Sequence, residues 1–264
     1  MTGFIGMGNM GFALLKGLLK SFEPEELMFS CRTEEKREEI SKLTGVKGTV
    51  NGEVASACGC IILAVKPQTY EEVFEEIKDK LLPGAILISL APGKSIDYIK
   101  RRLGEDKRVV RAMPNTPALI GCGMTGIAYD ETLFSVEEKE LIDRLFSSVG
   151  SYEKVPEEAI SAVVCASGSS PAYVYMFIDA LSKAAASKGL PEETALSMVT
   201  GAVMGAAMMV KESGESPEVL KSRVCSKGGT TIAGIGMLEE QGFTEAIEAA
   251  TEACYRRSEE LGAD

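Results

Sequence analysis

Two glycine clusters in the sequence could hold an anion with backbone amides. The first occupies residues 6–11, between the apolar run Gly3–Ile5 and a stretch of helical period. It reads Gly6-Met7-Gly8-Asn9-Met10-Gly11. In this spacing the first glycine permits a tight turn, the second lets the backbone approach a pyrophosphate, and the third allows close helix packing. A glycine-rich turn without a ligand is the alternative, but the position after a first strand favours a dinucleotide site.

The residues that follow the second strand-like run indicate which dinucleotide binds. The chain reads Ser30-Cys31-Arg32-Thr33 there, with Lys36 close behind. No carboxylate stands at this position to accept the ribose 2′-hydroxyl of NAD, whereas Arg32 and the flanking hydroxyls suit a 2′-phosphate. We therefore expect NADPH as the cofactor, ahead of NADH. The alternative is an Arg32 that is simply solvated at the end of a strand.

The second glycine cluster precedes a helical stretch that runs to about Gln241. It reads Ser226-Lys227-Gly228-Gly229-Thr230-Thr231. A Gly-Gly turn that enters a helix, with two threonines at its start, offers amides and hydroxyls to a small anion such as a carboxylate. Lys227 would add positive charge. Taken alone, a capped helix without a ligand is the commoner explanation of this pattern.

The composition excludes several other chemistries. The chain has 264 residues and no His, which removes Ser-His-Asp and Cys-His nucleophiles, imidazole acids and any zinc site that needs an imidazole, so we expect no metal. With 28 Lys and Arg against 39 Asp and Glu, the net charge of −11 disfavours nucleic acid and anionic membranes as partners. The seven scattered Cys and the lack of a secretory signal predict reduced thiols in a cytoplasmic protein.

The first half of the chain alternates strand and helix patterns. Apolar runs predict strands at Gly3–Ile5, Leu27–Cys31, Cys60–Val65, Ile86–Leu90 and Arg108–Ala112. Amphipathic stretches predict helices at Met10–Lys20, Glu34–Leu43, Tyr70–Leu81 and Ile96–Leu103. A strand at Gly123–Tyr129, a helix at Ser135–Ser148 and a strand at Tyr152–Val155 follow. This alternation predicts an α/β fold with a doubly wound parallel sheet and helices on both faces.

The second half, from Pro156 onward, is helical in period throughout. We therefore predict a dinucleotide-binding domain at residues 1–155 and a helical domain at residues 156–264. The uncharged stretches Ala112–Tyr129, Ile160–Ile178 and Ala195–Val210 are interrupted or too short to span a membrane, and we expect buried helices in the last two. These helices have more apolar surface than one small bundle can bury, which predicts that a second copy of the chain covers it. Coverage by the N-terminal domain is the alternative.

Five motifs together resemble those of pyrroline-5-carboxylate reductases, over nearly the whole chain. They are Ile5 to Gly11, Ala64-Val65-Lys66-Pro67, Met113-Pro114-Asn115-Thr116-Pro117, Ser167 to Tyr173 and Ser226 to Thr231. The most specific segment runs from Val224 to Gly234. The resemblance implies a Rossmann domain followed by an all-helical dimerisation domain that interlocks into a homodimer, often assembled further. The implied activity is an NADPH- or NADH-dependent oxidoreductase that reduces the imine of 1-pyrroline-5-carboxylate to L-proline, the last step of proline biosynthesis.

The resemblance also implies roles for matching residues. Residues 6–11 would hold the pyrophosphate; Ser30, Arg32 and Thr33 would face the adenosine ribose, with Asn51 near the adenine. The nicotinamide side would be lined by Ala64, Val65, Lys66, Pro67, Pro92 and Asn115. The substrate carboxylate would meet Ser226, Gly229, Thr230 and Thr231, with Thr231 also near the ring nitrogen as the catalytic residue and Glu157 as a further residue of this pocket. Catalysis would then consist mainly of positioning, since an iminium protonated from solvent is already polarised.

Two residues depart from the family pattern. Lys227 stands where the family usually has Pro, and Ser170 where it usually has Gly. For Ser167–Tyr173 we favour a kinked helix at a subunit interface over a catalytic role. A hydroxyacid dehydrogenase is disfavoured because it would need an Asn in the helical domain, and all three Asn precede residue 150. Reduction of another cyclic imine carboxylate and a non-catalytic dinucleotide-sensing regulator stay open as alternatives.

Overall fold

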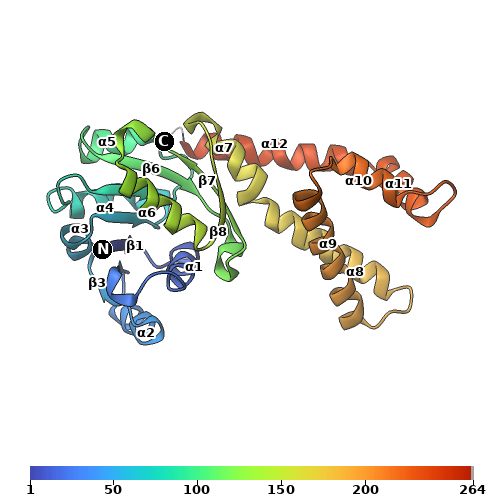
Figure 1. Cartoon of the computed structure of the whole chain (residues 1–264), viewed down its shortest axis with the longest axis horizontal. Coiled ribbons are helices and arrows are strands. Elements are labelled where there is room, and N and C mark those ends of the chain that lie inside the picture. The colour runs from blue at the N-terminus through green and yellow to red at the C-terminus, as the bar shows by residue number, and fades with distance from the viewer. Residues whose placement is uncertain (263–264) are drawn as a thin grey trace. The chain divides into compact units, whose positions relative to one another are not determined.

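The computed structural model describes residues 1–262, and its first half is built around one sheet of eight strands (Figure 1). The strands are β1 (Thr2–Ile5), β2 (Leu27–Ser30), β3 (Lys47–Thr49), β4 (Cys60–Leu63), β5 (Ile86–Ser89), β6 (Arg108–Met113), β7 (Gly123–Ala128) and β8 (Gly150–Lys154). Their order is β3-β2-β1-β4-β5-β6-β7-β8. Because the order reverses between β1 and β4, the carboxyl ends of these strands form the crevice where ligands bind in such sheets.

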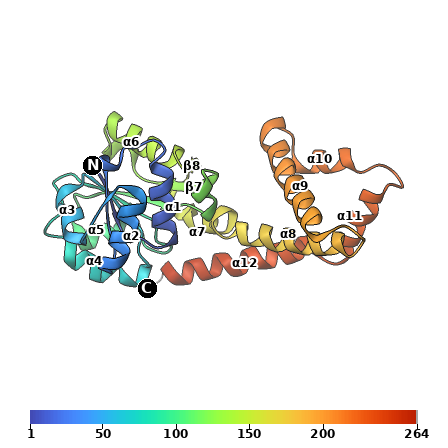
Figure 2. The ribbon, with the colours of Figure 1, turned by 90° about the horizontal axis from the view of Figure 1, so that it is seen from below.

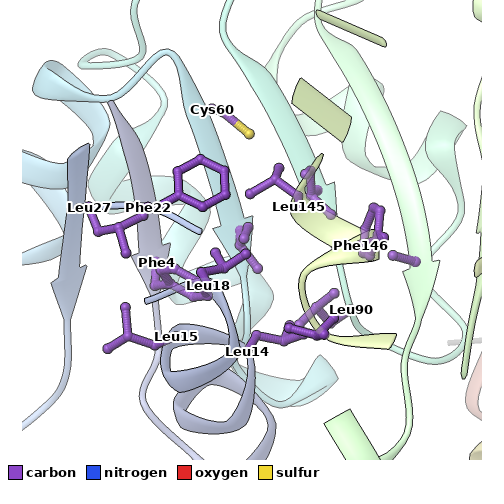
Figure 3. Packing of buried hydrophobic residues seen from close by; sticks show 14 of the residues in the cluster. Phe4, Leu14, Leu15, Leu18, Phe22, Leu27, Cys60, Leu90, Leu145 and Phe146 are labelled. Carbon is purple, nitrogen blue, oxygen red and sulfur yellow. The ribbon is translucent and has the colours of Figure 1, made fainter. Parts of the chain in front are cut away.

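Helices cover both faces of this sheet, as predicted. They are α1 (Asn9–Leu18), α2 (Glu34–Thr44), α3 (Asn51–Ala57), α4 (Tyr70–Ile77), α5 (Ile96–Leu103) and α6 (Val136–Ser147). One core cluster joins α1, α2 and α6 to the strands, and Figure 3 shows Phe4, Leu18 and Leu145 within it. A second cluster joins α3, α4 and α5 to the opposite face, with Ile5 next to Phe4 in sequence but on the other side. The doubly wound prediction is confirmed.

Three details of this first half differ from the expectation. Strand β7 runs antiparallel to β6, while β8 is parallel to β7, so the last two strands reverse the direction of the other six. Strand β3 and helix α3 carried no clear sequence signal: β3 has only three residues, Lys47, Gly48 and Thr49, without an apolar pair. Helix α3 has seven residues, of which Val54 and Ala55 are buried, too few to establish a period.

The second half is helical, as predicted. It contains α7 (Ile160–Val163), a π-helical turn (Val164–Gly168), α8 (Ser170–Ala186), α9 (Glu192–Ser213), α10 (Pro217–Val224), α11 (Thr230–Glu240) and α12 (Phe243–Gly262). By its contacts the chain forms two compact units. The first comprises residues 1–171 and 254–262, and the second comprises residues 172–253. The predicted boundary between residues 155 and 156 follows the end of strand β8 and stays a prediction.

The apolar helices of the second half are exposed in the single chain, so neither their own unit nor the first half buries them, and their burial by a second copy stays a prediction. Helix α8 buries only Ser182, and helix α9 buries only Ala195 and Val199. The stretches Glu157–Ala186 and Glu192–Ser213 are long and apolar enough to cross a membrane by length and composition, and 11% of each apolar window is buried. A few long helices cannot enclose a core of their own, so their apolar side chains stay uncovered. Figure 2 shows α8 to α11 from a second direction.

Candidate functional site

The loop between β1 and α1 leaves an open space at the N-terminus of α1. Gly6 has a φ of +101°, a conformation that other residues rarely adopt, and its N–H donates to the carbonyl oxygen of Ser30 at 3.0 Å. A Cβ on Gly11 would overlap the carbonyl oxygen of Gly6, whereas a Cβ on Gly8 would meet nothing within 4 Å. No side chain caps the first N–H groups of α1. This arrangement fits a pyrophosphate.

The other residues of the first cluster lie around this space in different ways. Asn9 is the exposed first residue of α1. Met7 is buried in the core cluster, and Met10 packs against the same cluster. Met7 can therefore serve the predicted site only through its backbone, and the side chains of Met7 and Met10 both help to hold the loop against the sheet.

A cavity of about 240 Å³ continues from Gly6 along the carboxyl ends of the strands. Its lining includes two arginines, Arg32 and Arg37, together with Asn51 and Val65. The structure thus brings together the predicted residues Gly6, Arg32, Asn51 and Val65. Two guanidinium groups in one cavity fit the phosphate of an adenosine 2′-phosphate, to which guanidinium groups donate bidentate hydrogen bonds.

Asn51 is held in place from two sides. Ser30 Oγ donates to Asn51 Oδ1 at 2.6 Å, and Asn51 Nδ2 donates to Glu76 Oε2 at 2.7 Å. Thr33, also predicted to face the ribose, caps helix α2 by accepting the N–H of Lys36 at 3.4 Å. The hydroxyls of Ser30 and Thr33 therefore make hydrogen bonds within the protein: Ser30 orients Asn51, and Thr33 caps α2.

Sequence reasoning missed three charged residues that line this cavity. Arg37 lies there instead of the expected Lys36, and its Nη1 donates to the carbonyl oxygen of Cys31 at 3.2 Å. The other two, Glu72 and Glu76, come from α4. The start of α2 at Glu34 could have indicated Arg37, because the first turn of that helix points back to the strand ends. Nothing local indicates the two glutamates, because α4 reaches the cavity only through the sheet order.

On the expected nicotinamide side, Ala64 and Val65 pack directly against the glycine loop. A Cβ on Gly11 would lie 3.0 Å from the Ala64 Cβ, and the N–H of Ala64 donates to the carbonyl oxygen of Ile5 at 2.8 Å. Lys66 and Pro67 follow at the start of a short 3₁₀ turn that leads into α4. These residues continue the carboxyl edge of the sheet from the pyrophosphate space.

Tyr70, the first residue of α4, joins the ends of β4 and β5. Its hydroxyl donates toward the carbonyl oxygen of Leu63 at 3.3 Å and lies 3.0 Å from Ser89 Oγ. Tyr70 is fully buried, and burial raises the pKa of its hydroxyl above the ordinary value. The phenol therefore stays neutral and fixes the strand ends from which Ala64 and Pro92 follow.

Tyr98 on α5 belongs to a small hydrogen-bond network with Glu71 and Arg102, shortly after the loop that contains Pro92. Its hydroxyl donates to Glu71 Oε1 at 2.6 Å, and Arg102 Nε donates to the same carboxylate at 2.9 Å. The hydrogen bond from Arg102 lowers the pKa of the Glu71 carboxyl, and burial together with Glu71 raises the pKa of Tyr98 to about 12. Lys94 Nζ lies 4.5 Å from the centre of the Tyr98 ring. Tyr98 thus stays a neutral donor that links α4 to α5.

Asn115 uses both polar atoms of its side chain within the protein. Its Nδ2 donates to the carbonyl oxygen of Ser167 at 3.0 Å, and its Oδ1 accepts the N–H of Met124 at 2.9 Å. The residue is buried and ties the end of β6 to β7 and to the π-helical turn. In that turn the Ser169 N–H donates to Val164 O at 2.8 Å, so the helix is irregular where a kink was predicted, and the predicted subunit interface there stays a prediction.

The second glycine cluster forms an exposed loop before α11, in the second unit. Gly229 is the N-cap of α11, its N–H donates to Ser226 O at 3.0 Å, and Gly228 has a φ of +74°. Ser226, Thr230 and Thr231 are exposed. The predicted turn and helix start are confirmed, and the hydroxyls and first-turn amides are free to face an anion.

Glu157 lies in the first unit and contacts two other segments of it. Its Oε1 accepts the N–H of Ile96 at 2.7 Å and lies 3.1 Å from Arg111 Nη1. The roles that the resemblance implies for Glu157, for the second loop and for the residues of the first site stay predictions.

Comparisons with known proteins agree with this arrangement. A family profile described as "Pyrroline-5-carboxylate reductase dimerisation" matches residues 157–261, and one described as "NADP oxidoreductase coenzyme F420-dependent" matches residues 1–93. The chain is 40% identical to a pyrroline-5-carboxylate reductase of Escherichia coli, over 98% of this chain and 97% of that protein. It is 36% identical to one from Arabidopsis thaliana, over 98% and 95%.

Solved structures give the same result. A Plasmodium falciparum pyrroline carboxylate reductase with NADP bound superposes with a TM-score of 0.89 at 31% identity, covering 99% of this chain and 97% of that one. A pyrroline-5-carboxylate reductase from Coxiella burnetii has the same TM-score at 36% identity, covering 98% and 97%. With relatives this similar over nearly the full length of both chains, the protein belongs to the pyrroline-5-carboxylate reductase family.

Proposed function

We propose that this chain reduces the imine bond of 1-pyrroline-5-carboxylate to give L-proline, with NADPH as the reductant. The observation that carries the proposal is the full-length identity of 40% to a relative named for this activity. The open glycine loop at residues 6–11 and the cavity with Arg32 and Arg37 support a phosphorylated dinucleotide as the partner in the reaction. The relative from Plasmodium falciparum with NADP bound supports the same cofactor, with NADH second.

Binding of the dinucleotide assigns a task to each part of the first unit. The N–H groups at the start of α1 hold the pyrophosphate, and Gly8 leaves the space for it. Arg32 and Arg37 hold the 2′-phosphate, and Asn51 stays oriented toward the adenosine because Ser30 and Glu76 fix its amide. Ala64, Val65, Lys66, Pro67, Pro92 and Asn115 line the nicotinamide side.

The reaction needs a hydride, which the reduced nicotinamide supplies when bound. The carbon of the protonated imine accepts it, the electrons of the C=N π bond move to the nitrogen, and a secondary amine results. Thr231 Oγ1 accepts the N–H of the ring nitrogen and so fixes the orientation of the ring. Ser226, Gly229 and Thr230 hold the substrate carboxylate through hydroxyls and amides. Because solvent supplies the proton on nitrogen, catalysis is mainly positioning.

Self-association is part of the proposal. The dimerisation profile matches residues 157–261, and methionines on α9 such as Met198, Met204 and Met208 are more than half exposed in the single chain. Apolar surface of this extent marks an interface. We infer that two copies of the chain form a homodimer through the helices of the second unit, residues 172–253, and that these dimers assemble further. The enzyme works in the cytoplasm, with small-molecule substrates and its own second copy as partners, and without nucleic acid or membrane.

The experiment that tests the activity is identification of the product. The protein is incubated with 1-pyrroline-5-carboxylate and NADPH, and the mixture is analysed by chiral chromatography. One L-proline is expected for each NADPH consumed. NADPH consumption without L-proline would overturn the assigned substrate, and the absence of both would overturn the assigned activity.

A further inference from the structure

Glu157 connects three parts of the first unit that are distant in sequence. Glu157 comes shortly after strand β8, Ile96 is the first residue of helix α5, and Arg111 lies within strand β6. The distances from Glu157 Oε1 are 2.7 Å to the Ile96 nitrogen and 3.1 Å to Arg111 Nη1. One carboxylate oxygen therefore serves a helix N-terminus and a guanidinium together.

Arg111 needs this partner because it is buried. Its side chain is 10% exposed and projects from the sheet on the side of Val109, where α5 packs, since its neighbours Val110 and Ala112 face the other cluster. A buried guanidinium without a counter-ion is strongly unfavourable. The ion pair with Glu157 satisfies this requirement and fixes the position of the carboxylate.

Ile96 needs the same carboxylate for a different reason. The N-cap of α5 is Ser95, whose Oγ accepts the N–H of Tyr98 at 3.0 Å and is thereby used. The N–H of Ile96 also belongs to the first turn and has no partner within the helix. Glu157 accepts it, and its negative charge interacts favourably with the positive end of the helix. The start of α5 is thus tied to β6 through Glu157.

The segment fixed in this way is the loop at residues 90–95, which contains Pro92. At its beginning, the Leu90 N–H donates to the carbonyl oxygen of Leu63 at 3.2 Å. At its middle, Gly93 has a φ of +76° and lies so close to the backbone of Leu261 and Gly262 that no Cβ fits. At its end stands Ile96. These three contacts hold the loop, and the contact at Ile96 is made by Glu157, which also pairs with the buried guanidinium of Arg111.

We infer that Glu157 is a positioning residue: through Arg111 and the N-terminus of α5 it fixes the loop at residues 90–95, and so the nicotinamide side of the cofactor site, without contacting the substrate. This inference rests on the proposed function and replaces the placement of Glu157 in the substrate pocket. Glu157 Oε1 already has two protein partners, so this atom has little capacity left for a ligand.

Two variants separate a positioning role from a substrate contact. Glu157→Gln keeps an acceptor for the Ile96 N–H but loses the ion pair, and Glu157→Ala loses both. Glu158→Gln is the matched control, because Glu158 is the exposed neighbour. Two readouts need no turnover: the Kd for NADPH from fluorescence titration without substrate, and amide hydrogen exchange over residues 91–99. Steady-state kinetics add kcat and the KM for 1-pyrroline-5-carboxylate.

The inference predicts that Glu157→Ala raises the Kd for NADPH about 10-fold and speeds exchange over residues 91–99 by a similar factor, with a smaller effect in Glu157→Gln. The KM for 1-pyrroline-5-carboxylate stays within about twofold, and Glu158→Gln matches the wild type. A higher substrate KM with unchanged NADPH binding and exchange would overturn the inference. If Glu157→Ala does not fold, Glu157→Gln decides by the same readouts. A wild type that binds NADPH but reduces no substrate contradicts the proposed function alone, since binding and exchange still test Glu157.

Discussion

The carbonyl oxygen of Gly6 lies so close to Gly11 that no Cβ fits between them, and Gly8 between the two faces open space. The three glycines of one motif therefore have separable tasks. Gly6 and Gly11 allow β1 and α1 to approach, which is a requirement of folding. A Cβ on Gly8 would meet nothing within 4 Å, so the space beside it is available to a ligand.

Because of this difference, a substitution at Gly8 should weaken NADPH binding and leave the stability of the fold nearly unchanged. Gly8→Ala is expected to raise the Kd for NADPH at least about 10-fold, because the new methyl group occupies the pyrophosphate space, while stability changes by less than about 1 kcal/mol. Fluorescence titration and urea unfolding measure the two quantities. Gly59→Ala is the matched control, since a Cβ there also meets nothing within 4 Å, and it should change neither. Equal NADPH affinity in Gly8→Ala and wild type would contradict the placement of the pyrophosphate.

The second prediction concerns the choice of dinucleotide. Arg32→Ala and Arg37→Ala should each weaken NADPH binding about 10- to 100-fold and leave NADH binding within about threefold, because only NADPH carries the 2′-phosphate. Lys36→Ala is the control: Lys36 adjoins Arg37 in sequence but does not line the cavity. Kd values for both dinucleotides decide the question. Parallel losses for NADPH and NADH would show that the arginines hold the fold and not the phosphate.

The fold could be predicted from the sequence wherever a pattern was long enough to repeat. The apolar runs that became β1, β2, β4, β5 and β6 have four or more consecutive buried residues, and a parallel sheet with covered faces requires such runs. Strand β3 and helix α3 were not predicted, because their conformation depends on packing against β2 and α4 and not on a local period in the sequence. The reversal at β7 is likewise decided by sheet pairing.

The site could be predicted as far as it depends on backbone. The spacing of Gly6, Gly8 and Gly11 alone predicts a pyrophosphate site, and the position of Arg32 after a strand predicts its contact with the 2′-phosphate. Arg37 and Glu76 enter the cavity because of where α2 and α4 pack, which no local pattern records. Glu157 is the instructive case, because its contacts with Ile96 and Arg111 span 61 and 46 positions of the chain.

Thr231 carries the third prediction. Thr231→Ala should lower kcat about 10- to 100-fold, equivalent to about 1.4 to 2.7 kcal/mol of barrier, because the ring nitrogen loses its hydrogen-bond partner. Thr231→Ser keeps the hydroxyl and should retain most of the rate. NADPH binding should be the same in both variants. Unchanged turnover in Thr231→Ala would contradict the assigned role.

The fourth prediction concerns assembly through the helical unit. Met204→Glu places a charge on an exposed apolar position of α9, and a buried unpaired charge strongly disfavours an interface. Light scattering after size exclusion should show loss of the dimer toward the 28.1 kDa single chain. Val136→Glu, on α6 and 66% exposed, is the control and should stay dimeric. A dimeric Met204→Glu protein would place the interface elsewhere.

The most direct test of the proposed function is the rate of NADPH oxidation, followed by absorbance, with 1-pyrroline-5-carboxylate as substrate. A six-membered cyclic imine carboxylate and an imine with its carboxylate at the 2-position serve as comparisons. The proposal predicts fast turnover of 1-pyrroline-5-carboxylate and a markedly lower kcat/KM for both others. A preference for either comparison would contradict the assigned substrate, and NADPH binding without turnover of any of the three would contradict the assignment as an enzyme.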